Sequence, residues 1–287
     1  MYVRKIGVVG AGTIGRGIAE LAISKGFEVV INDISTQKLS VAIADLQTRI
    51  DQMVAMGKMS EADKKDALRR LRAAPDHIDL KGADIIIEAV DESYEQKSKA
   101  FRQIDRAVSP DTVIASNTSS ISINKLASIL SHPHRFIGMH FLNPVPDVTL
   151  VEIVRGLQTS EPTYALIVSL ANHLGKSSIT VNGTTGSAVT RILLPMINEA
   201  FFVLDESDLT AADIDNAMKL GCDHPVGPLA LADAMGLDVV LGTIQALYGE
   251  LSEAKYRPCP LLKEMVAAGN LGRKTGRGVY DYSYKPI

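Results

Sequence analysis

Short apolar runs alternate with longer stretches of mixed character along the first two thirds of the chain. A continuous apolar run of about four to eight residues is typical of a strand covered on both faces of a parallel sheet, and the intervening stretches are long enough for helices. The alternation therefore predicts a doubly wound α/β domain. The runs that we predict to be strands are residues 4–9, 27–33, 83–90, 112–115, 135–138, 150–154 and 178–181.

A charged stretch that favours helix extends from residue 35 to residue 72. It is interrupted near Gly57, which suits a helix C-cap, and Ser60 with Asp63 then suits an N-cap and an acidic first turn. We therefore expect two antiparallel helices that protrude from the sheet as a hairpin. The second helix carries basic residues, which form either a solvated face or a basic rim for a polyphosphate ligand. These residues are Lys64, Lys65, Arg69, Arg70 and Arg72.

The chain becomes helical and strongly apolar from about residue 187 onward. Residues 191–201 are too apolar for a surface helix, and Pro195 is expected to kink this helix unless it lies in a first turn. Thr210 suits the N-cap of a second helix, and residues 229–247 predict a third. Because these apolar helices are unbroken, we expect an all-α domain that buries a subunit contact as well as a core, and hence a homodimer.

The polar segment 182–186 is the best candidate for a linker between these two parts. We therefore predict an N-terminal α/β domain over residues 1–182 and a C-terminal helical domain over residues 183–287. A chain of 287 residues is long enough for two ordinary domains.

Composition narrows the class of protein further. The net charge of −3 gives no general attraction to nucleic acid or to an anionic membrane. No apolar run approaches the roughly 20 residues of a membrane span, and the first strand leaves no room for a targeting peptide. Cys222 and Cys259 lack metal-ligand spacing and are expected to be free thiols of a reducing compartment. We expect a cytoplasmic enzyme without a metal, nucleic-acid or membrane partner.

The first predicted strand leads into a glycine turn and a helix. Gly10, Gly12 and Gly15 have the G-x-G-x-x-G spacing, in which the glycines allow a tight turn, close approach of a pyrophosphate, and close helix–strand packing. The helix N-terminus, at Thr13 and Ile14, offers free N–H groups to phosphates. Asp33 ends the second strand, where a carboxylate binds ribose hydroxyls and repels a 2′-phosphate. The pattern predicts a Rossmann-like domain that binds NAD(H); the alternative is a glycine-rich turn with a surface acid.

Polar residues follow two other predicted strands. The acids Glu88, Asp91 and Glu92 come at the end of one strand, where ligands bind in open α/β sheets, and a helix containing Lys97 follows. The small polar residues 116–120 come after the next strand and favour a loop that hydrogen-bonds a partner. The alternative is that Ser119 or Ser120 is a plain helix N-cap.

His140 lies at the end of a predicted strand, beside a loop that contains Asn143 and two prolines. Glu152 interrupts the next apolar strand, where an unpaired buried carboxylate would cost roughly 2 kcal/mol or more. A His–Glu pair satisfies this acid, and it is also the arrangement that orients a general base. The other histidines lie in loop or helix settings that favour structural roles. They are His77, His132, His134, His173 and His224.

These patterns occur together in one family. The chain resembles the short-chain L-3-hydroxyacyl-CoA dehydrogenases, most closely the stand-alone bacterial 3-hydroxybutyryl-CoA dehydrogenases. The resemblance covers nearly the whole chain and implies NAD-dependent interconversion of 3-hydroxyacyl-CoA and 3-ketoacyl-CoA. The segments that carry it are GVVGAGTIGRGIA, ADIIIEAVDE, SNTSSISI, MHFLNPVP with LVEIV, HPVGPLALADAMGLD and LGRKTGRGVYDY.

The resemblance also implies roles for single residues. His140 matches the catalytic base and Glu152 the acid that orients it, and Ser119 and Asn143 match residues that bind the reacting oxygen and the cofactor. The residues that match the lining of the NAD site are Asp33, Glu92, Lys97 and Lys274. The helical pair around Arg49 and Lys58 matches the arm that meets coenzyme A. The second domain is similar to the family's helical dimerisation domain.

The sequence departs from the family at residues 185–191. The family has Pro-Gly-Phe and, three residues on, Asn-Arg, whereas this chain has Thr185-Gly186-Ser187 and Thr190-Arg191. A Thr at position 190 lacks the reach and the two donors of a carboxamide near the substrate. Two alternatives therefore stay open: a related dehydrogenase of a free hydroxy or sugar acid, and a catalytically weak NAD-binding protein like the lens crystallins that resemble this family.

Overall fold

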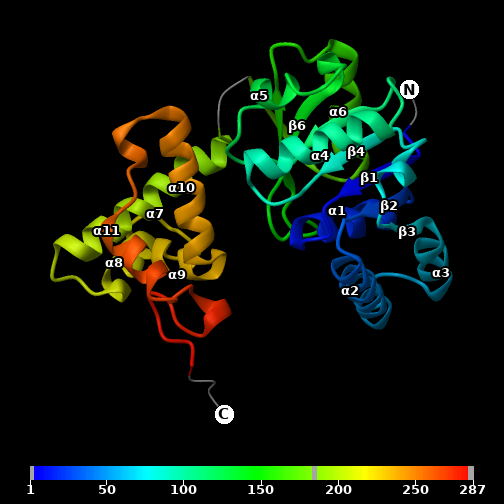
Figure 1. The fold of residues 1–287 in the computed structure, drawn as a ribbon. Helices are drawn as coiled ribbons and strands as arrows, with labels where there is room; N and C mark the ends of the chain where they lie inside the picture. The colour runs from blue at the N-terminus through cyan, green and yellow to red at the C-terminus, as the bar shows by residue number, and fades with distance from the viewer. Residues whose placement is uncertain (1–2, 183–185, 284–287) are drawn as a thin grey trace. The chain divides into compact units, whose positions relative to one another are not determined.

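The computed structural model describes residues 3–182 and 186–283. The chain divides into two compact units, with the boundary between Ser187 and Ala188 (Figure 1). The predicted domain boundary after Asn182 falls beside residues 183–185, so this part of the linker lies outside the described residues.

Within the described residues, eight strands of the first unit form one sheet in the order β3-β2-β1-β4-β5-β6-β7-β8. Strands β1 to β6 pair in parallel, β7 is antiparallel to β6, and β8 is parallel to β7. The order reverses at β1, as in doubly wound dinucleotide-binding folds. This confirms the predicted fold class. The strands are β1 Lys5–Val9, β2 Glu28–Asn32, β3 Leu71–Ala74, β4 Ile85–Glu88, β5 Val113–Ser116, β6 Phe136–Phe141, β7 Leu150–Arg155 and β8 Ser177–Asn182.

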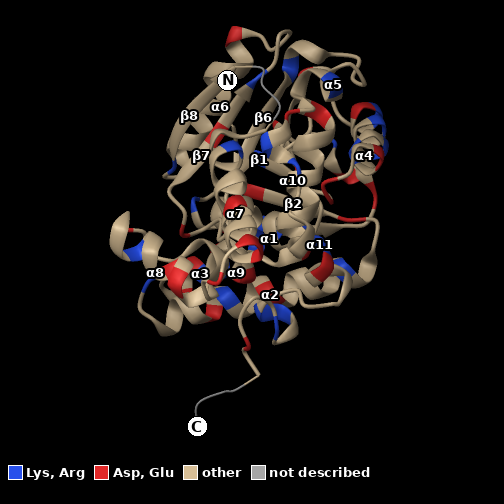
Figure 2. Ribbon diagram, turned by 90° about the vertical axis from the view of Figure 1, so that its left-hand side faces the viewer, with Lys and Arg blue, Asp and Glu red and all other residues tan. Residues whose placement is uncertain are grey.

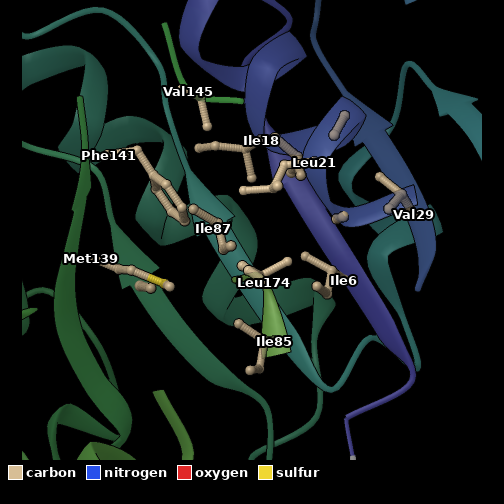
Figure 3. Close-up of a cluster of buried hydrophobic side chains, with 14 of the residues drawn as sticks. Ile6, Ile18, Leu21, Val29, Ile85, Ile87, Met139, Phe141, Val145 and Leu174 are labelled. Atoms are coloured by element: carbon tan, nitrogen blue, oxygen red, sulfur yellow. The ribbon is translucent and has the colours of Figure 1, made fainter. Parts of the chain in front are cut away.

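Helices cover both faces of this sheet. On one face, Ile18 and Leu21 of α1 pack against Ile87 of β4 (Figure 3), and on the other face Phe101 of α4 packs against Phe136 of β6. Two apolar layers therefore bury the parallel strands, which explains their continuous apolar sequence. The helices of this unit are α1 Thr13–Ser24, α2 Thr36–Ala55, α3 Glu61–Arg70, α4 Tyr94–Ala107, α5 Ile123–Ala127 and α6 Glu161–His173, with 3₁₀ turns η1 His77–Leu80 and η2 Pro133–Arg135.

The predicted helical pair is present as α2 and α3, and Ser60 caps α3 by accepting a hydrogen bond from the backbone N–H of Asp63. The predicted end of the pair is wrong, however. The helix stops at Arg70, and Leu71–Ala74 forms the edge strand β3, parallel to β2. This segment has no β-branched residue, so its own composition favours helix, and only pairing with β2 makes it a strand.

The second unit is helical around its own apolar core, which includes Leu194, Phe201 and Ile244. Thr210 is the N-cap of α8, as predicted, and it forms a capping box with Asp213. Pro195 lies inside α7, beyond its first turn. The helices are α7 Ala188–Glu206, α8 Ala211–Gly221, α9 Pro228–Met235, α10 Leu237–Leu251 and α11 Pro260–Ala267, with 3₁₀ turns η3 Ala254–Tyr256 and η4 Arg273–Thr275.

The prediction of one helix over residues 229–247 is wrong. Gly236 has a φ of 97°, which breaks the run into α9 and α10, and the two helices are bent by 98°. Among the described helices none alone is long and apolar enough to span a membrane, and only this bent pair passes that test jointly. Cys222 and Cys259 are free thiols, as predicted.

Candidate active site

The glycine turn between β1 and α1 has the geometry of a phosphate-binding turn. Gly10 has a φ of 107°, and a Cβ there would lie 2.5 Å from the carbonyl oxygen of Ala89. A Cβ at Gly15 would overlap the carbonyl oxygen of Gly10, whereas a Cβ at Gly12 would meet no atom within 4 Å. Open space therefore lies beside Gly12, and α1 begins at Thr13, so its first N–H groups are free to meet a pyrophosphate.

Asp33 stands immediately after β2 and binds this turn. Its Oδ2 accepts a hydrogen bond from the backbone N–H of Ala11 (3.0 Å), and its Oδ1 accepts one from Ser35 (2.9 Å). A cavity of about 380 Å³ lies at the carboxyl ends of β1, β2 and β4, and its lining includes Gly10, Gly12 and Asp33. The turn, the acid and the cavity together fit the adenosine half of a dinucleotide.

A buried ion network underlies the end of β4. The Lys97 ammonium, 1% exposed, donates to Glu88 Oε1 (2.7 Å) and to the carbonyl oxygen of Val90 (3.2 Å), and it lies 3.3 Å from Glu92 Oε2. Burial works against the charge on Lys97, but the two carboxylates raise the pKa of Lys97 above its ordinary value. Glu88 Oε2 also accepts a hydrogen bond from Ser116 Oγ (2.6 Å), so the network joins β4, β5 and α4.

Glu92 is the partner of the polar loop that follows β5. Its Oε1 accepts hydrogen bonds from Thr118 Oγ1 (2.6 Å), from the backbone N–H of Ser119 (2.9 Å), and from both the N–H (2.9 Å) and Oγ (2.8 Å) of Ser120. Desolvation works against ionisation, but Lys97 and these donors hold the pKa of Glu92 below its ordinary value. The alternative that Ser119 or Ser120 caps a helix is wrong, because Ser122 caps α5.

His140 and Glu152 are direct neighbours across the β6–β7 pair. The antiparallel register places the two residues opposite each other, and His140 Nδ1 lies 2.8 Å from Glu152 Oε2. The side chains are 8% and 0% exposed. The predicted contact is therefore present. Because Nδ1 is engaged by the carboxylate, Nε2 is the ring nitrogen left for proton exchange with a substrate.

Two asparagines flank this pair. Asn143 is exposed in the loop that follows β6. Asn117, which sequence reasoning did not single out, accepts a hydrogen bond at Oδ1 from the backbone N–H of Phe141 (2.8 Å) and so ties the end of β6 to the loop after β5. The only signal in the sequence is that Asn117 belongs to the polar run directly after a buried strand.

Some basic residues of the helical pair are engaged with nearby acids. Arg49 pairs with Asp45 (3.1 Å) and Glu20 (3.6 Å). Figure 2 shows Lys and Arg scattered among Asp and Glu over the described ribbon. Lys64 pairs with Asp51 (2.7 Å), and Lys58 is exposed. For Lys64, the contact with Asp51 favours the solvated face over the basic rim.

Two further basic residues do not lie where the rim requires them. Arg72 is in β3 and not on α3, so its predicted place on the helix is wrong. Arg70 donates to the carbonyl oxygen of Ile23 at the end of α1.

The remaining predicted site residues belong to the second unit. Thr190 is buried in the first turn of α7, and Lys274 in η4 forms an ion pair with Asp238 of α10. Gly186 has a φ of 83°, while Thr185 lies outside the described residues. In the described part of the chain, no group of three or more His, Cys, Asp or Glu side chains is arranged to hold a metal ion.

A doubly wound sheet with a glycine turn, an acid directly after β2 and a His–Glu pair at the strand ends is the arrangement of an NAD-binding oxidoreductase. The chain matches "3-hydroxyacyl-CoA dehydrogenase, NAD binding domain" over residues 5–184 and "3-hydroxyacyl-CoA dehydrogenase, C-terminal domain" over residues 186–282. The chain therefore belongs to the 3-hydroxyacyl-CoA dehydrogenase family, and it is an NAD-dependent oxidoreductase.

Similar proteins cover the same length. A 3-hydroxybutyryl-CoA dehydrogenase of Bradyrhizobium diazoefficiens is 45% identical over 286 residues, which are 99% of this chain and 98% of that protein. The crystal structure of an (S)-3-hydroxybutyryl-CoA dehydrogenase from Ralstonia eutropha is 52% identical, with a TM-score of 0.93 over 99% of this chain and 100% of the other. A diketoreductase structure is 25% identical, with a TM-score of 0.82 over 98% of this chain and 100% of the other.

Proposed function

We propose that this protein interconverts (S)-3-hydroxybutyryl-CoA and acetoacetyl-CoA with NAD(H). The observation that carries the proposal is the His140–Glu152 pair at 2.8 Å, at the same edge of the sheet as the glycine turn. The names of the similar proteins from Bradyrhizobium and Ralstonia support the choice of substrate.

In the oxidative direction, His140 Nε2 removes the proton of the C3 hydroxyl, and Glu152 stabilises the imidazolium that forms. Bound NAD(H) supplies the acceptor or donor of the hydride at C3. In the reductive direction, His140 returns its proton to the C3 oxygen. Burial of the pair supports this role, because the charge of Glu152 acts on the imidazole with little screening by water.

Ser119 and Asn143 hold the reacting oxygen within hydrogen-bond reach, which is mainly a positioning contribution. The weak contact between Ser119 Oγ and Glu92 Oε1 (3.3 Å) supports this role, because a substrate oxygen can take its place. Thr190 contributes to the substrate site from the second unit. Arg49 and Lys58 contact coenzyme A.

The cofactor is held by backbone and side-chain groups of the first unit, together with Lys274 of the second. The turn residues Gly10, Gly12, Thr13, Ile14 and Gly15 meet the pyrophosphate. The remaining residues of the set are Asp33 at the adenosine ribose, Glu92 and Lys97 after the end of β4, Ser119, and Asn143.

The protein assembles as a homodimer through its helical unit and works in the cytoplasm. Exposed Ile192 (74%), Leu220 (86%) and Val239 (49%) on the helices of this unit support the dimer. Free Cys222 and Cys259 support a reducing compartment.

The test is NADH consumption with acetoacetyl-CoA. His140→Ala is expected to lower kcat by about 10²- to 10⁴-fold, because general acid–base catalysis contributes that much. The matched control is His173→Ala, which removes an exposed histidine whose Nδ1 contacts Ser169 of the same helix, α6. If wild type has no turnover and His140→Ala changes nothing, the proposal is wrong.

A second candidate function is oxidoreduction of a hydroxy or keto acid that carries no coenzyme A. Thr190, in place of the family Asn, and the similarity to a diketoreductase favour it. Saturable activity on free hydroxy acids, with none on CoA thioesters, would decide for this candidate. A Thr190→Asn variant assayed alongside tests whether this position sets the choice.

A further inference from the structure

Lys176 is a buried cation that none of the roles above includes. It lies between α6 and β8 and is 5% exposed. Its ammonium donates to the carbonyl oxygens of Val145 (2.6 Å), Val148 (2.7 Å) and Pro146 (3.2 Å). An ammonium has three N–H donors, so all three are used on one short loop.

That loop connects the two strands of the His–Glu pair. Residues 142–149 leave β6 just after His140, carry Asn143, and enter β7 just before Glu152. The loop is closed internally, because the backbone N–H groups of Asp147 and Val148 both donate to the carbonyl oxygen of Pro144 (3.1 and 3.0 Å). The carbonyl groups bound by Lys176 belong to this same turn.

The opposite side of the loop packs on the helix that follows the glycine turn. Val145 is 1% exposed and lies beside Ile18 of α1 (Figure 3). A Cβ at Gly17 would lie 2.8 Å from Val145 Cβ, so α1 and the loop are in direct contact. The loop is therefore held between Lys176 on one side and α1 on the other.

The backbone of Lys176 is itself fixed at both ends. Gly175, with a φ of 75°, ends α6, and the N–H of Lys176 donates to the carbonyl oxygen of Ala171 (2.9 Å). The next residue, Ser177, donates to the carbonyl oxygen of Thr149 (2.8 Å) at the other end of the same loop. A charge placed so rigidly under three carbonyl groups constrains the loop more than a solvent-exposed lysine does.

We propose that Lys176 is a positioning residue for the reaction: its three hydrogen bonds hold the loop of residues 142–149, and thereby fix Asn143 relative to His140. The inference rests on the proposed function, in which Asn143 binds the reacting oxygen. Lys176 touches neither substrate nor cofactor and acts through the loop.

The experiment replaces Lys176 by Met, which has a similar length and no donors. We expect kcat for acetoacetyl-CoA to fall about 10- to 100-fold, because small displacements of a positioning group have effects of this size. The dissociation constant of NADH, measured by its fluorescence, should change much less than kcat, because Asn143 is the one member of the proposed cofactor set that lies on this loop. Amide exchange at Asp147 and Val148 should become faster.

Two further variants separate positioning from a general loss of structure. Lys25→Met is the matched control, because Lys25 lies against Gly175 but donates to none of the three carbonyl groups, and it should keep wild-type kcat. Gly17→Ala disturbs Val145 from the α1 side, and it should reproduce the loss of kcat even if Lys176→Met does not fold.

A double-mutant cycle identifies the group through which Lys176 acts. In an Asn143→Ala background, Lys176→Met should lower kcat no further, because the group that it positions is already absent. Wild-type kcat in Lys176→Met, or equal loss of kcat in both backgrounds, would overturn the inference while leaving the proposed function intact. If wild type does not act on acetoacetyl-CoA at all, the proposed function is wrong. Independently of activity, unchanged amide exchange at Asp147 and Val148 in Lys176→Met would overturn the inference that Lys176 holds the loop.

Discussion

In the first unit, the buried acids Glu88 and Glu152 contact Lys97 and His140, side chains that carry or exchange a proton. In the second unit, the buried acid Asp233 instead accepts from the backbone N–H groups of Val279 and Tyr280 (both 2.9 Å) and from Tyr282 OH (3.0 Å). Both environments satisfy a carboxylate. They differ in the kind of partner: a basic side-chain nitrogen in the first unit, and backbone N–H groups with a phenol hydroxyl in the second.

Asp215 repeats the second arrangement. It accepts from the N–H groups of Leu229 (2.8 Å) and Ala230 (2.9 Å) at the start of α9, and from Tyr280 OH (2.7 Å). Burial and the Asp215 carboxylate raise the pKa of Tyr280 well above its ordinary value, so this hydroxyl stays protonated. A buried acid with such partners fixes a turn and a tail, whereas a buried acid beside an imidazole orients that imidazole.

The sharpest way to break this comparison is to neutralise one acid of each kind with its amide. Glu152→Gln should lower kcat with acetoacetyl-CoA by about 10²- to 10⁴-fold, because an uncharged amide no longer stabilises the His140 imidazolium. NADH affinity should stay within about twofold, since Glu152 lies outside the glycine turn. Steady-state kinetics and a fluorescence titration measure the two effects. A kcat within threefold of wild type would show that the pair is only structural.

Asp233→Asn is the counterpart in the second unit. The amide nitrogen cannot accept, so at least one partly buried donor among Val279, Tyr280 and Tyr282 loses its partner, at about 1–3 kcal/mol for each. We expect the midpoint of thermal unfolding to fall by about 5–10 °C. Because the chain has no Trp, circular dichroism follows the transition. The kcat per folded molecule should be unchanged at 20 °C, and a loss as large as that of Glu152→Gln would remove the distinction between the two units.

The sequence predicts the first kind of acid better than the second. Glu152 stands out because it interrupts an apolar strand, and the period of two along β6 and β7 leaves His140 as its neighbour. Asp233 and Asp215 lie in helices, where an acid is ordinary, and their partners come from a distant tail. No local pattern reports a contact between α9 and residues 279–282.

The difference between features specified by local sequence and features specified by a distant partner also explains which predictions of the fold are wrong. Continuous apolar strands are specified by their own residues, whereas β3 is a strand only because β2 offers it hydrogen bonds. The break at Gly236 depends on a positive φ, which a single glycine in an apolar run does not announce. The sequence predicts that Glu92 lies near the cofactor. It does not predict that Glu92 binds the loop after β5, because this contact exists only where the ends of β4 and β5 lie side by side in the sheet.

The smallest expected effect concerns Glu92, which has features of both kinds of acid: an ionic partner, Lys97, and backbone N–H partners at Ser119 and Ser120. In the folded protein the pKa of Glu92 is below its ordinary value. The ionised carboxylate therefore stabilises the fold fully above the unfolded pKa of about 4.5, and this stabilisation is lost as the pH falls through the lower, folded pKa. Wild type should therefore lose thermal stability as the pH is lowered below about 4.5, and Glu92→Gln should lose less over the same range, from a lower starting point. Midpoints of thermal unfolding between pH 7 and pH 3.5 measure this difference, with Glu95→Gln, an acid of the same region that carries no such contacts, as control. Parallel pH curves for wild type and Glu92→Gln would mean that the contacts of Glu92 with Lys97, Ser119 and Ser120 contribute nothing to stability. The comparison between the two kinds of acid would then not extend to Glu92.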